Sequence, residues 1–279
     1  MPNRNVAAHL AQLERLLEER QELTTRDIMS ILGVSESTAR RLIHRLAAQD
    51  GITRTFGGVC RTPSPATEYR YEMLERQGQR GKREIAQRAL ALIGGTDVLY
   101  LDGGTTNACL AQTLSETCRA GRFPGLTVFT NSLVTLNLLA PVCPVYCTGG
   151  RYRPARRDFC GEQAESAVQG VRFSKCFLGA DACEVTRGFT TTDFETARLC
   201  ATVLERSAKS YVLADADKFG RTALLPYAPL AACTAIVTDS ALSPARREAF
   251  AAAGARFLPA DPDGRRPAHS TSPHFTPEV

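Results

Sequence analysis

LDGGTTNACLAQTL, residues 101–114, is the segment from which the fold of this 279-residue chain is best predicted. An apolar run ends at Asp102, two glycines and two threonines follow, and a helical pattern then begins. Glycines allow backbone N–H groups to approach an anion without obstruction by a Cβ atom, and the N-terminus of a helix favours negative charge. The segment therefore predicts a strand, a phosphate-binding loop and a helix, with a plain turn as the alternative for the loop.

Further apolar runs with the length of a buried strand follow the same plan. With residues 97–102, they are residues 126–131, 144–150, 175–181, 210–215 and 234–239. Helical patterns separate them, at residues 82–93, 105–118, 161–170, 194–208 and 244–253. This alternation predicts an α/β fold class, in which a doubly wound, mostly parallel sheet is covered by helices on both faces.

Polar or glycine residues stand where these runs end. They are Asp102, Asn131, Gly149, Asp181, Asp215 and Asp239. In open α/β sheets, ligands bind beyond the carboxyl ends of the strands. We therefore expect most of these residues to border one crevice, with Asp239 as the residue that can lie outside it.

The candidate ligand-binding residues follow from side-chain chemistry at these ends. Glycine amides and threonine hydroxyls suit a phosphate, carboxylates suit sugar hydroxyls, and a lysine directly after a strand can neutralise a phosphate. The set is Asp102, Gly103, Gly104, Thr105, Thr106, Asn131, Ser132, Gly149, Gly150, Asp181 and Lys218. Capping of the next helix is the alternative role for Asn131 and Ser132, and Lys218 has the alternative of a surface lysine.

Four arginines after Gly150 predict a basic loop that lies mainly in solvent, with direct ligand contact as the alternative. They are Arg151, Arg153, Arg156 and Arg157.

Residues 23–58, LTTRDIMSILGVSESTARRLIHRLAAQDGITRTFGG, predict two helices joined by a short turn and followed by a β-hairpin. Thr24 or Thr25 can cap the first of them, Gly33 supplies the tight turn, and Ser35 can cap the second. A preceding helix is predicted from an apolar face at helical spacing, formed by Val6, Leu10, Leu13 and Leu17.

The helix after Ser35 has an apolar stripe and an opposite cationic face. The stripe comprises Ala39, Leu42, Ile43 and Leu46. Docking by this stripe would leave the polar face to enter a major groove, where arginine can bond guanine and hydroxyls can bond phosphates or bases. The hairpin then reads as a wing. The candidate DNA-binding residues are Thr25, Ser35, Ser37, Thr38, Arg40, Arg41, His44, Arg45 and Arg54. A small helical bundle with a solvated charged face is the alternative.

Residues 32–58 resemble the winged helix of the DeoR/GlpR family of bacterial sugar regulators. The family's V-S-x-x-T-[IV]-R-R-D-L core is matched at Val34-Ser35, Thr38 and Arg40-Arg41, and its wing at Gly57-Gly58. The chain departs from the pattern at Ala39, at Leu42-Ile43 in place of Asp-Leu, and at Phe56 where histidine is common. These departures are expected to change which operator sequence is bound, and to leave the fold unchanged.

The resemblance extends over roughly residues 5–260. An ordered set of segments is similar to the family's effector domain: DGGTT (102–106), TNS (130–132), GG (149–150), GADA (179–182), GFTTTDFETA (188–197) and LADADKFGRTAL (213–224). The resemblance implies a sensor domain that is similar in fold to ribose-5-phosphate isomerase and binds a phosphorylated sugar or polyol.

The predicted domain organisation is a winged helix-turn-helix at residues 1–60, a linker at 61–80, an α/β sensor at 81–260 and a disordered tail at 261–279. No apolar run is long enough to span a membrane and no secretory signal is seen, so we expect a cytoplasmic protein associated with the bacterial nucleoid. Ten cysteines without a C-x-x-C pair predict buried thiols rather than a metal or redox site. No cofactor or metal is predicted.

Three functions are compatible with these features. The leading one is a transcriptional regulator, by family usually a repressor of a carbohydrate or polyol operon, that binds operator DNA as a homodimer or homotetramer and is released by a phosphorylated sugar. The second is a sugar-phosphate isomerase with an accessory domain, using carboxylates such as Asp102, Asp181, Asp193 or Glu195. The third is an architectural DNA-binding protein whose α/β domain only oligomerises. All four histidines lie outside residues 81–260, which disfavours the isomerase.

Overall fold

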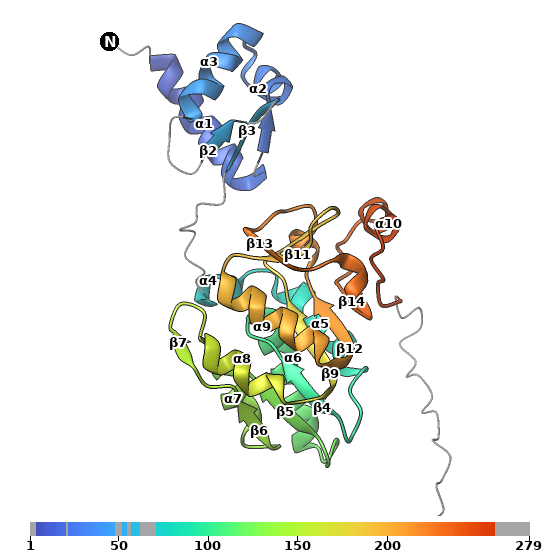
Figure 1. The fold of residues 1–279 in the computed structure, drawn as a ribbon. Coiled ribbons are helices and arrows are strands. Elements are labelled where there is room, and N and C mark those ends of the chain that lie inside the picture. The colour runs from blue at the N-terminus through green and yellow to red at the C-terminus, as the bar shows by residue number, and fades with distance from the viewer. Residues whose placement is uncertain (1–3, 21, 48–51, 55–56, 62–70, 260–279) are drawn as a thin grey trace, which may run out of the picture. The chain divides into compact units, whose positions relative to one another are not determined.

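The computed structural model describes residues 4–20, 22–47, 52–54, 57–61 and 71–259. The chain divides into two compact units, Met1–Glu68 and Tyr69–Val279. The predicted tail at 261–279 and residues 62–70 of the predicted linker lie outside the described residues. Each unit is described by itself below (Figure 1).

The N-terminal unit is a winged helix-turn-helix. Its helices are α1 (Arg4–Arg20), α2 (Thr25–Leu32) and α3 (Glu36–Leu46), and its strands are β1 (Glu22–Thr24), β2 (Ile52–Arg54) and β3 (Gly58–Arg61). The strands form an antiparallel sheet in the order β1-β3-β2. The predicted wing is therefore confirmed, whereas β1 was not predicted, because three residues before a helix cap carry no strand pattern of their own.

Local chemistry explains where these helices begin and end. Thr24 caps α2: its hydroxyl accepts from the Asp27 N–H, and the Asp27 carboxylate accepts from the Thr24 N–H, a reciprocal pair worth about 1 kcal/mol. Gly33 ends α2 in the left-handed region at φ 63°, which disfavours other residues. Ser35 occupies the cap position of α3, but its hydroxyl faces those of Ser37 and Thr38 at 3.1 Å instead of a backbone N–H.

The C-terminal unit is built on a six-stranded parallel sheet in the order β14-β12-β9-β4-β5-β6. All six apolar runs predicted as strands are strands of this sheet. They are β4 (Val98–Leu101), β5 (Thr127–Thr130), β6 (Val145–Cys147), β9 (Phe173–Gly179), β12 (Ser207–Leu213) and β14 (Ala235–Val237).

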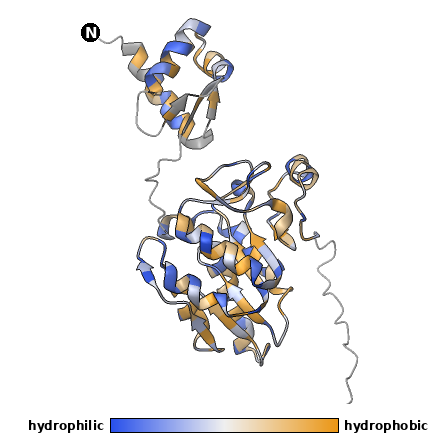
Figure 2. Ribbon diagram, viewed as in Figure 1, coloured by the Kyte–Doolittle hydropathy of each residue, from blue (hydrophilic) through white to orange (hydrophobic). Residues whose placement is uncertain are grey.

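Helices cover both faces of the sheet, as the alternation predicted. Alternate residues of β4 point to opposite faces: Leu99 and Leu101 pack in a core with α5 (Gln79–Leu90), α6 (Thr105–Arg119) and α7 (Leu133–Leu139). Tyr100 packs in the other core, with α8 (Glu162–Gln169), α9 (Phe194–Glu205) and α10 (Pro244–Ala252). The strands accordingly appear as apolar ribbons beneath amphipathic helices in Figure 2.

Short elements complete the C-terminal unit, and the sequence did not predict them. The strands are β7 (Arg151–Arg153) and β8 (Asp158–Cys160), which form a hairpin, and β10 (Ala182–Glu184), β11 (Gly188–Thr191) and β13 (Leu225–Ala228), which form a small antiparallel sheet. The single turns are η1 (Ala216–Lys218) and η2 (Leu230–Ala232). Helix α4 (Tyr71–Arg76) lies inside the predicted linker but belongs to this unit, because Tyr71 is buried and its N–H donates to Ala155 O at 3.0 Å.

Candidate functional site

The connections of the parallel sheet define a topological switch point between β4 and β9. From β4 the chain adds β5 and β6 on one side, and then crosses to add β9, β12 and β14 on the other. In such sheets the loops beside the switch point leave in opposite directions and open a crevice at the carboxyl ends of the strands. The loop from Asp102 to Gly104 and the residues from Gly179 to Asp181 lie side by side at this point, since the Gly179 N–H donates to Asp102 Oδ2 at 3.0 Å.

The loop after β4 presents backbone donors. Gly104 precedes α6 with φ 93° and ψ 164°, a conformation open essentially to glycine. No described side chain caps the N-terminus of α6, and its first turn holds no acidic residue. Thr105 and Thr106 are half-buried at this end. The loop thus combines a helix N-terminus without a side-chain cap, two hydroxyls and the positive end of a helix dipole, which together suit an anion.

Asp102 is buried at the switch point. The side chain is 5% exposed, and Oδ2 accepts from the Gly179 N–H at 3.0 Å and from Cys200 Sγ at 3.6 Å. Burial raises the pKa of Asp102 to about 6, although the backbone hydrogen bonds of Gly179 and Gly103 oppose the rise. A buried carboxyl that titrates near neutrality beside a crevice is typical of a functional site.

This carboxyl predicts a pH dependence of stability. The unfolded carboxyl has a pKa of about 3.9, so between about pH 4 and 6 the native state holds the proton more tightly. The stabilising contribution is complete below about pH 4 and is lost as the pH rises through about 6, by roughly 3 kcal/mol. We expect Asp102→Asn to gain about 2 kcal/mol over the unsubstituted chain at about pH 7.5 relative to about pH 4.5, because part of the contribution is already lost at pH 4.5; urea unfolding measures it. A difference between the two proteins that is the same at both pH values would contradict the assignment.

Two buried asparagines point amide groups toward the same loop. Asn107 donates to Gly103 O at 3.4 Å, and Asn131 donates to Phe159 O at 3.3 Å. Each side chain is 1% exposed, and within the described residues neither Oδ1 atom has a hydrogen-bond partner. Buried polar atoms of this kind are costly and often await a ligand or water. Asn131 was a predicted site residue; Asn107 was missed because it lies inside an ordinary helical pattern.

Other predicted site residues have structural partners. Ser132 caps α7, since its Oγ accepts from the Thr135 N–H at 3.2 Å, which was the alternative role. Gly149 and Gly150 have φ of 66° and 103° and turn the chain from β6 into the β7–β8 hairpin. A Cβ on Gly150 would lie 2.5 Å from Cys160 O, so close packing alone requires glycine there.

The arginines of the β7–β8 hairpin divide into two exposed and two largely buried residues. The side chains of Arg151 and Arg157 are 64% and 40% exposed, in agreement with the predicted solvated loop. For Arg153 and Arg156, whose side chains are only 11% exposed, the prediction was wrong. Arg153 forms a bidentate pair with Asp158 at 2.7 and 2.8 Å and also contacts Asp193 at 2.8 Å, so its acidic partners come from β8 and the start of α9.

Asp181, predicted to meet sugar hydroxyls, is engaged by protein groups. Its Oδ2 accepts from Arg156 at 3.1 Å, from Thr191 Oγ1 at 2.9 Å and from the Thr192 N–H at 2.9 Å. Burial alone would raise the pKa of Asp181, but Arg156 and the nearby Lys218 hold it below its ordinary value. Asp181 therefore stays charged and anchors the hairpin.

Two lysines lie toward the β12 side of the crevice. Lys218 is half-buried in η1, directly after β12. Lys82, which the sequence did not single out, is buried on α5, and its ammonium donates to Leu74 O and, at 2.7 Å, to Gln77 O. Burial lowers the pKa of Lys82, and Lys218 adds to this while Asp215 opposes it. Asp215 and Lys218 stand at the two ends of η1, the single turn that follows β12.

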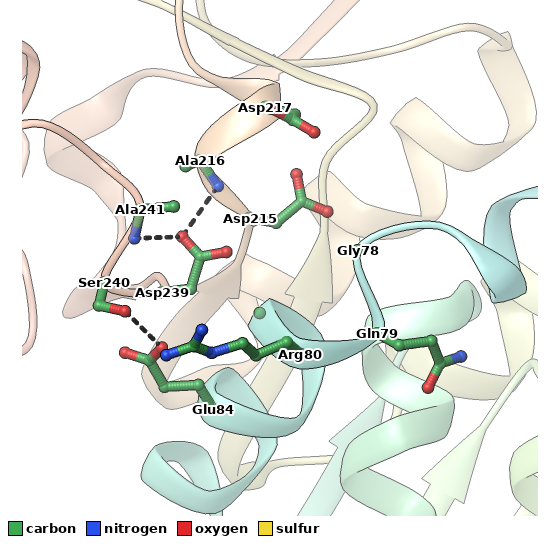
Figure 3. A pocket seen from close by; sticks show the side chains of 11 residues that line it. Gly78, Gln79, Arg80, Glu84, Asp215, Ala216, Asp217, Asp239, Ser240 and Ala241 are labelled. Atoms are coloured by element: carbon green, nitrogen blue, oxygen red, sulfur yellow. Dashed lines mark hydrogen bonds between the residues drawn. The ribbon is translucent and has the colours of Figure 1, made fainter.

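A cavity of about 460 Å³ lies between the start of α5 and the segments that follow β12 and β14 (Figure 3). Asp215 and Asp239 reach it from the ends of β12 and β14, and the N-terminal turn of α5 forms the opposite wall. Asp239 Oδ1 accepts from the N–H groups of Ala216 and Ala241, each at 3.3 Å. Since β14 is the edge strand, Asp239 lies away from the switch point, as the sequence analysis allowed.

The outer face of α3 is the candidate DNA interface. Ser35, Ser37 and the basic residues of this face are exposed, and Thr38 is half-buried. Arg40 pairs with Glu36 at 2.6 Å, and Arg41 reaches Thr38 Oγ1 at 3.4 Å. In the described part of the chain, no acidic side chain pairs with the three remaining basic residues, Arg41, His44 and Arg45.

The wing is tied to the start of α2. The N–H and Oγ1 of Thr25 both donate to Gly57 O, at 2.7 and 2.9 Å. Gly58 allows β3 to pass against β1, since a Cβ there would lie 2.1 Å from Leu23 O. Arg54 ends β2, and its side chain lies outside the described residues.

The described part of the chain contains no group of three or more His, Cys, Asp or Glu side chains that could hold a metal ion. Its cysteines are unpaired thiols, of which Cys176 and Cys200 are buried in the core. None of its helices combines the length and apolar character needed to cross a bilayer.

Comparisons with known proteins match both units. The family model of the DeoR-like helix-turn-helix domain matches residues 10–64, and that of the DeoR C terminal sensor domain matches residues 77–240. The HTH-type transcriptional regulator GlpR of Haloferax volcanii is 32% identical over 223 residues, 80% of this chain and 86% of that protein. The putative aga operon transcriptional repressor of Escherichia coli O157:H7 is 27% identical over 251 residues, 88% and 91% of the two chains.

A solved structure with a related arrangement is ribose 5-phosphate isomerase A from Methanocaldococcus jannaschii. It aligns with a TM-score of 0.39 and 17% identity over 51% of this chain and 55% of the isomerase.

Proposed function

The chain belongs to the DeoR family of DNA-binding transcriptional regulators, and from this premise we propose that a phosphorylated sugar or polyol, bound at the switch point between β4 and β9, releases it from its operator. The single observation that carries the proposal is the loop from Asp102 to Thr106. It brings two threonine hydroxyls and a helix N-terminus without a side-chain cap to the carboxyl end of β4, the edge at which doubly wound sheets bind their ligands.

The two kinds of group around this loop would orient the effector. Its phosphate would lie at the N-terminus of α6, where Gly104, Thr105 and Thr106 supply donors, with Lys218, in η1 after β12, as a balancing cation. Acceptors lie deeper in the site.

The acceptors are suited to hydroxyls and not to phosphate. Asp102 carries a carboxylate, and the Oδ1 atoms of Asn107 and Asn131 lack partners among the described residues. A ligand that offers a phosphate at one end and hydroxyls at the other would satisfy both sets, whereas an unphosphorylated sugar would leave the donor loop unused.

The isomerase alternative is not favoured. The sequence offers no histidine between residues 81 and 260, and three of the four candidate carboxylates are committed to ion pairs. Asp181 pairs with Arg156, Asp193 with Arg153, and Glu195 with Arg151. Such carboxylates are poorly placed to move protons.

The DNA-bound form is proposed to be a homodimer or homotetramer that represses a carbohydrate or polyol operon in the cytoplasm, on the nucleoid of a bacterial cell. A single winged helix buries little surface, and two copies related by symmetry would read paired half-sites. A relative named as a lactose phosphotransferase system repressor, from Staphylococcus epidermidis, supports the assignment to sugar metabolism.

A thermal-shift screen tests the proposal. The panel is ribose 5-phosphate, glucose 6-phosphate, fructose 1-phosphate and glycerol 3-phosphate, each with its unphosphorylated parent as the control. At a concentration about 100-fold above the dissociation constant, a binder stabilises the native state by about 2.7 kcal/mol and raises the unfolding temperature by several degrees. We expect a shift with at least one phosphate and none with its parent. Equal shifts with both, or none with any compound, would contradict the proposed effector, and turnover of a bound phosphate at ordinary enzyme rates would favour the isomerase.

A further inference from the structure

The β7–β8 hairpin, residues 151–160 and here called the strap, lies directly on the proposed effector loop. Its second strand, β8, pairs with the residues just after β5. The Phe159 N–H donates to Asn131 O at 2.7 Å, and Ser132 and Asp158 form an antiparallel β-bridge. Asp158 is buried, and its Oδ2 lies 3.2 Å from the position that a Cβ on Gly103 would occupy. The strap therefore packs directly against Gly103 of the effector loop and against the end of β5.

The strap also crosses the switch point to the β9 side. Arg156 donates to Asp181 at 3.1 Å, at the end of β9, and to Thr192 Oγ1 at 2.7 Å. Arg153 contacts Asp193 at 2.8 Å and Thr196 Oγ1 at 2.9 Å, at the start of α9. Two guanidinium groups thus fasten the strap to the segments that follow β9. Arg153 also bonds Asp158 Oδ2, the atom that lies against Gly103, which brings this guanidinium close to the loop where we place the phosphate.

The outer side of the strap holds α4. The Tyr71 N–H donates to Ala155 O at 3.0 Å, and Arg157 pairs with Glu72 at 2.6 Å while its guanidinium lies 5.1 Å from the centre of the Tyr71 ring. Arg157 adopts φ 54°, a left-handed conformation that is costly for a residue with a side chain. In sequence, α4 follows the segment that leads from the winged helix.

From these contacts we propose that the strap transmits effector binding to α4, and so to the connection with the DNA-binding domain; the identity of the effector rests on the proposed function. Phosphate competes with Asp181 and Asp193 for the guanidinium groups of Arg153 and Arg156, because arginine bonds phosphate and carboxylate with the same geometry. Loss of these anchors shifts the turn that carries Ala155 and Arg157. Since those two residues hold α4, the effector stabilises a different position of α4.

Hydrogen exchange on the full chain tests the mechanical part without any ligand. We expect Arg156→Gln to raise the exchange rates of the strap amides and also those of α4, residues 71–76, by about tenfold or more, because α4 depends on the strap. Arg198→Gln is the matched control: it removes an exposed arginine from a pair with Glu165, between α8 and α9, and should leave α4 unchanged. Faster exchange in the strap with unaltered α4 amides would overturn the proposal.

A second set of variants separates transmission from binding. Glu72→Gln, which lies outside the effector site, is expected to keep the thermal shift given by the strongest panel phosphate but to lose most of the five- to 150-fold release from DNA that such coupling provides. The charge-swapped pair E72R with R157E should restore release. Normal release of Glu72→Gln from DNA would overturn transmission through the strap and α4 while leaving the proposed function intact. Absence of any thermal shift in the unsubstituted chain would overturn the proposed function, and with it the response of the strap to a ligand.

Discussion

Arg41→Ala is expected to weaken operator binding by about a hundredfold or more while leaving the thermal shift with sugar phosphates unchanged. Arg41 is exposed on α3, and no described carboxylate competes for its guanidinium. An arginine that reads guanine contributes about 1–3 kcal/mol to discrimination, and a symmetric dimer makes the contact twice. Fluorescence anisotropy with an operator fragment recovered by binding selection would measure the loss.

Two comparison variants make this result specific. Arg122→Ala removes an arginine from the sensor unit, where it stacks on Phe123, and should not alter DNA affinity. Arg40→Ala should cost less than Arg41→Ala, because Arg40 already shares its charge with Glu36 in an exposed i,i+4 pair. Operator affinity of Arg41→Ala equal to that of Arg122→Ala would remove Arg41 from the interface.

Thr105→Ala is expected to weaken effector binding by roughly 10- to 100-fold with little change in affinity for DNA. Thr105 begins α6, and a hydrogen bond from its hydroxyl to a charged phosphate would contribute about 1.5–3 kcal/mol. The measurement is a titration of the thermal shift with the strongest panel phosphate, followed by the concentration of that compound needed for release from the operator fragment.

Thr113→Ala is the matched control, because it makes the same substitution two turns further along α6. The Thr113 hydroxyl donates to Cys109 O at 3.0 Å, within the helix, and faces no candidate ligand group. We expect effector affinity close to that of the unsubstituted chain. If both threonine variants behaved alike, the loss could not be assigned to the phosphate-binding loop.

The main elements of the fold could be predicted because their signals are local. Each strand of the parallel sheet is a short apolar run, and helix ends such as Thr24 and Gly33 carry chemistry that acts within three or four residues. The donor loop at 102–106 is local in the same sense, since a strand end, two glycines and a helix start are contiguous in the sequence.

The rest of the site depends on contacts between distant residues. Arg153 and Arg156 read as solvated in the sequence, but they are buried against Asp181 and Asp193, which other elements supply. Asn107 became a candidate only when burial left its carbonyl oxygen without a partner among the described residues.

The same limitation explains the segment predicted as a linker. Residues 61–80 are predicted as a linker that runs into a helix, but α4 is held by Ala155 and Arg157, more than 75 residues along the chain. No pattern in a single sequence reports such a pairing, so the connection between site and linker emerges only from the structure.

The most direct test of the central claim is to titrate the full chain, bound to its operator fragment, with the strongest panel phosphate and its unphosphorylated parent. We predict that the phosphate lowers operator affinity by about five- to 150-fold and that the parent sugar or polyol leaves it unchanged. DNA affinity that stays constant across saturating concentrations of a phosphate that demonstrably binds would contradict the account.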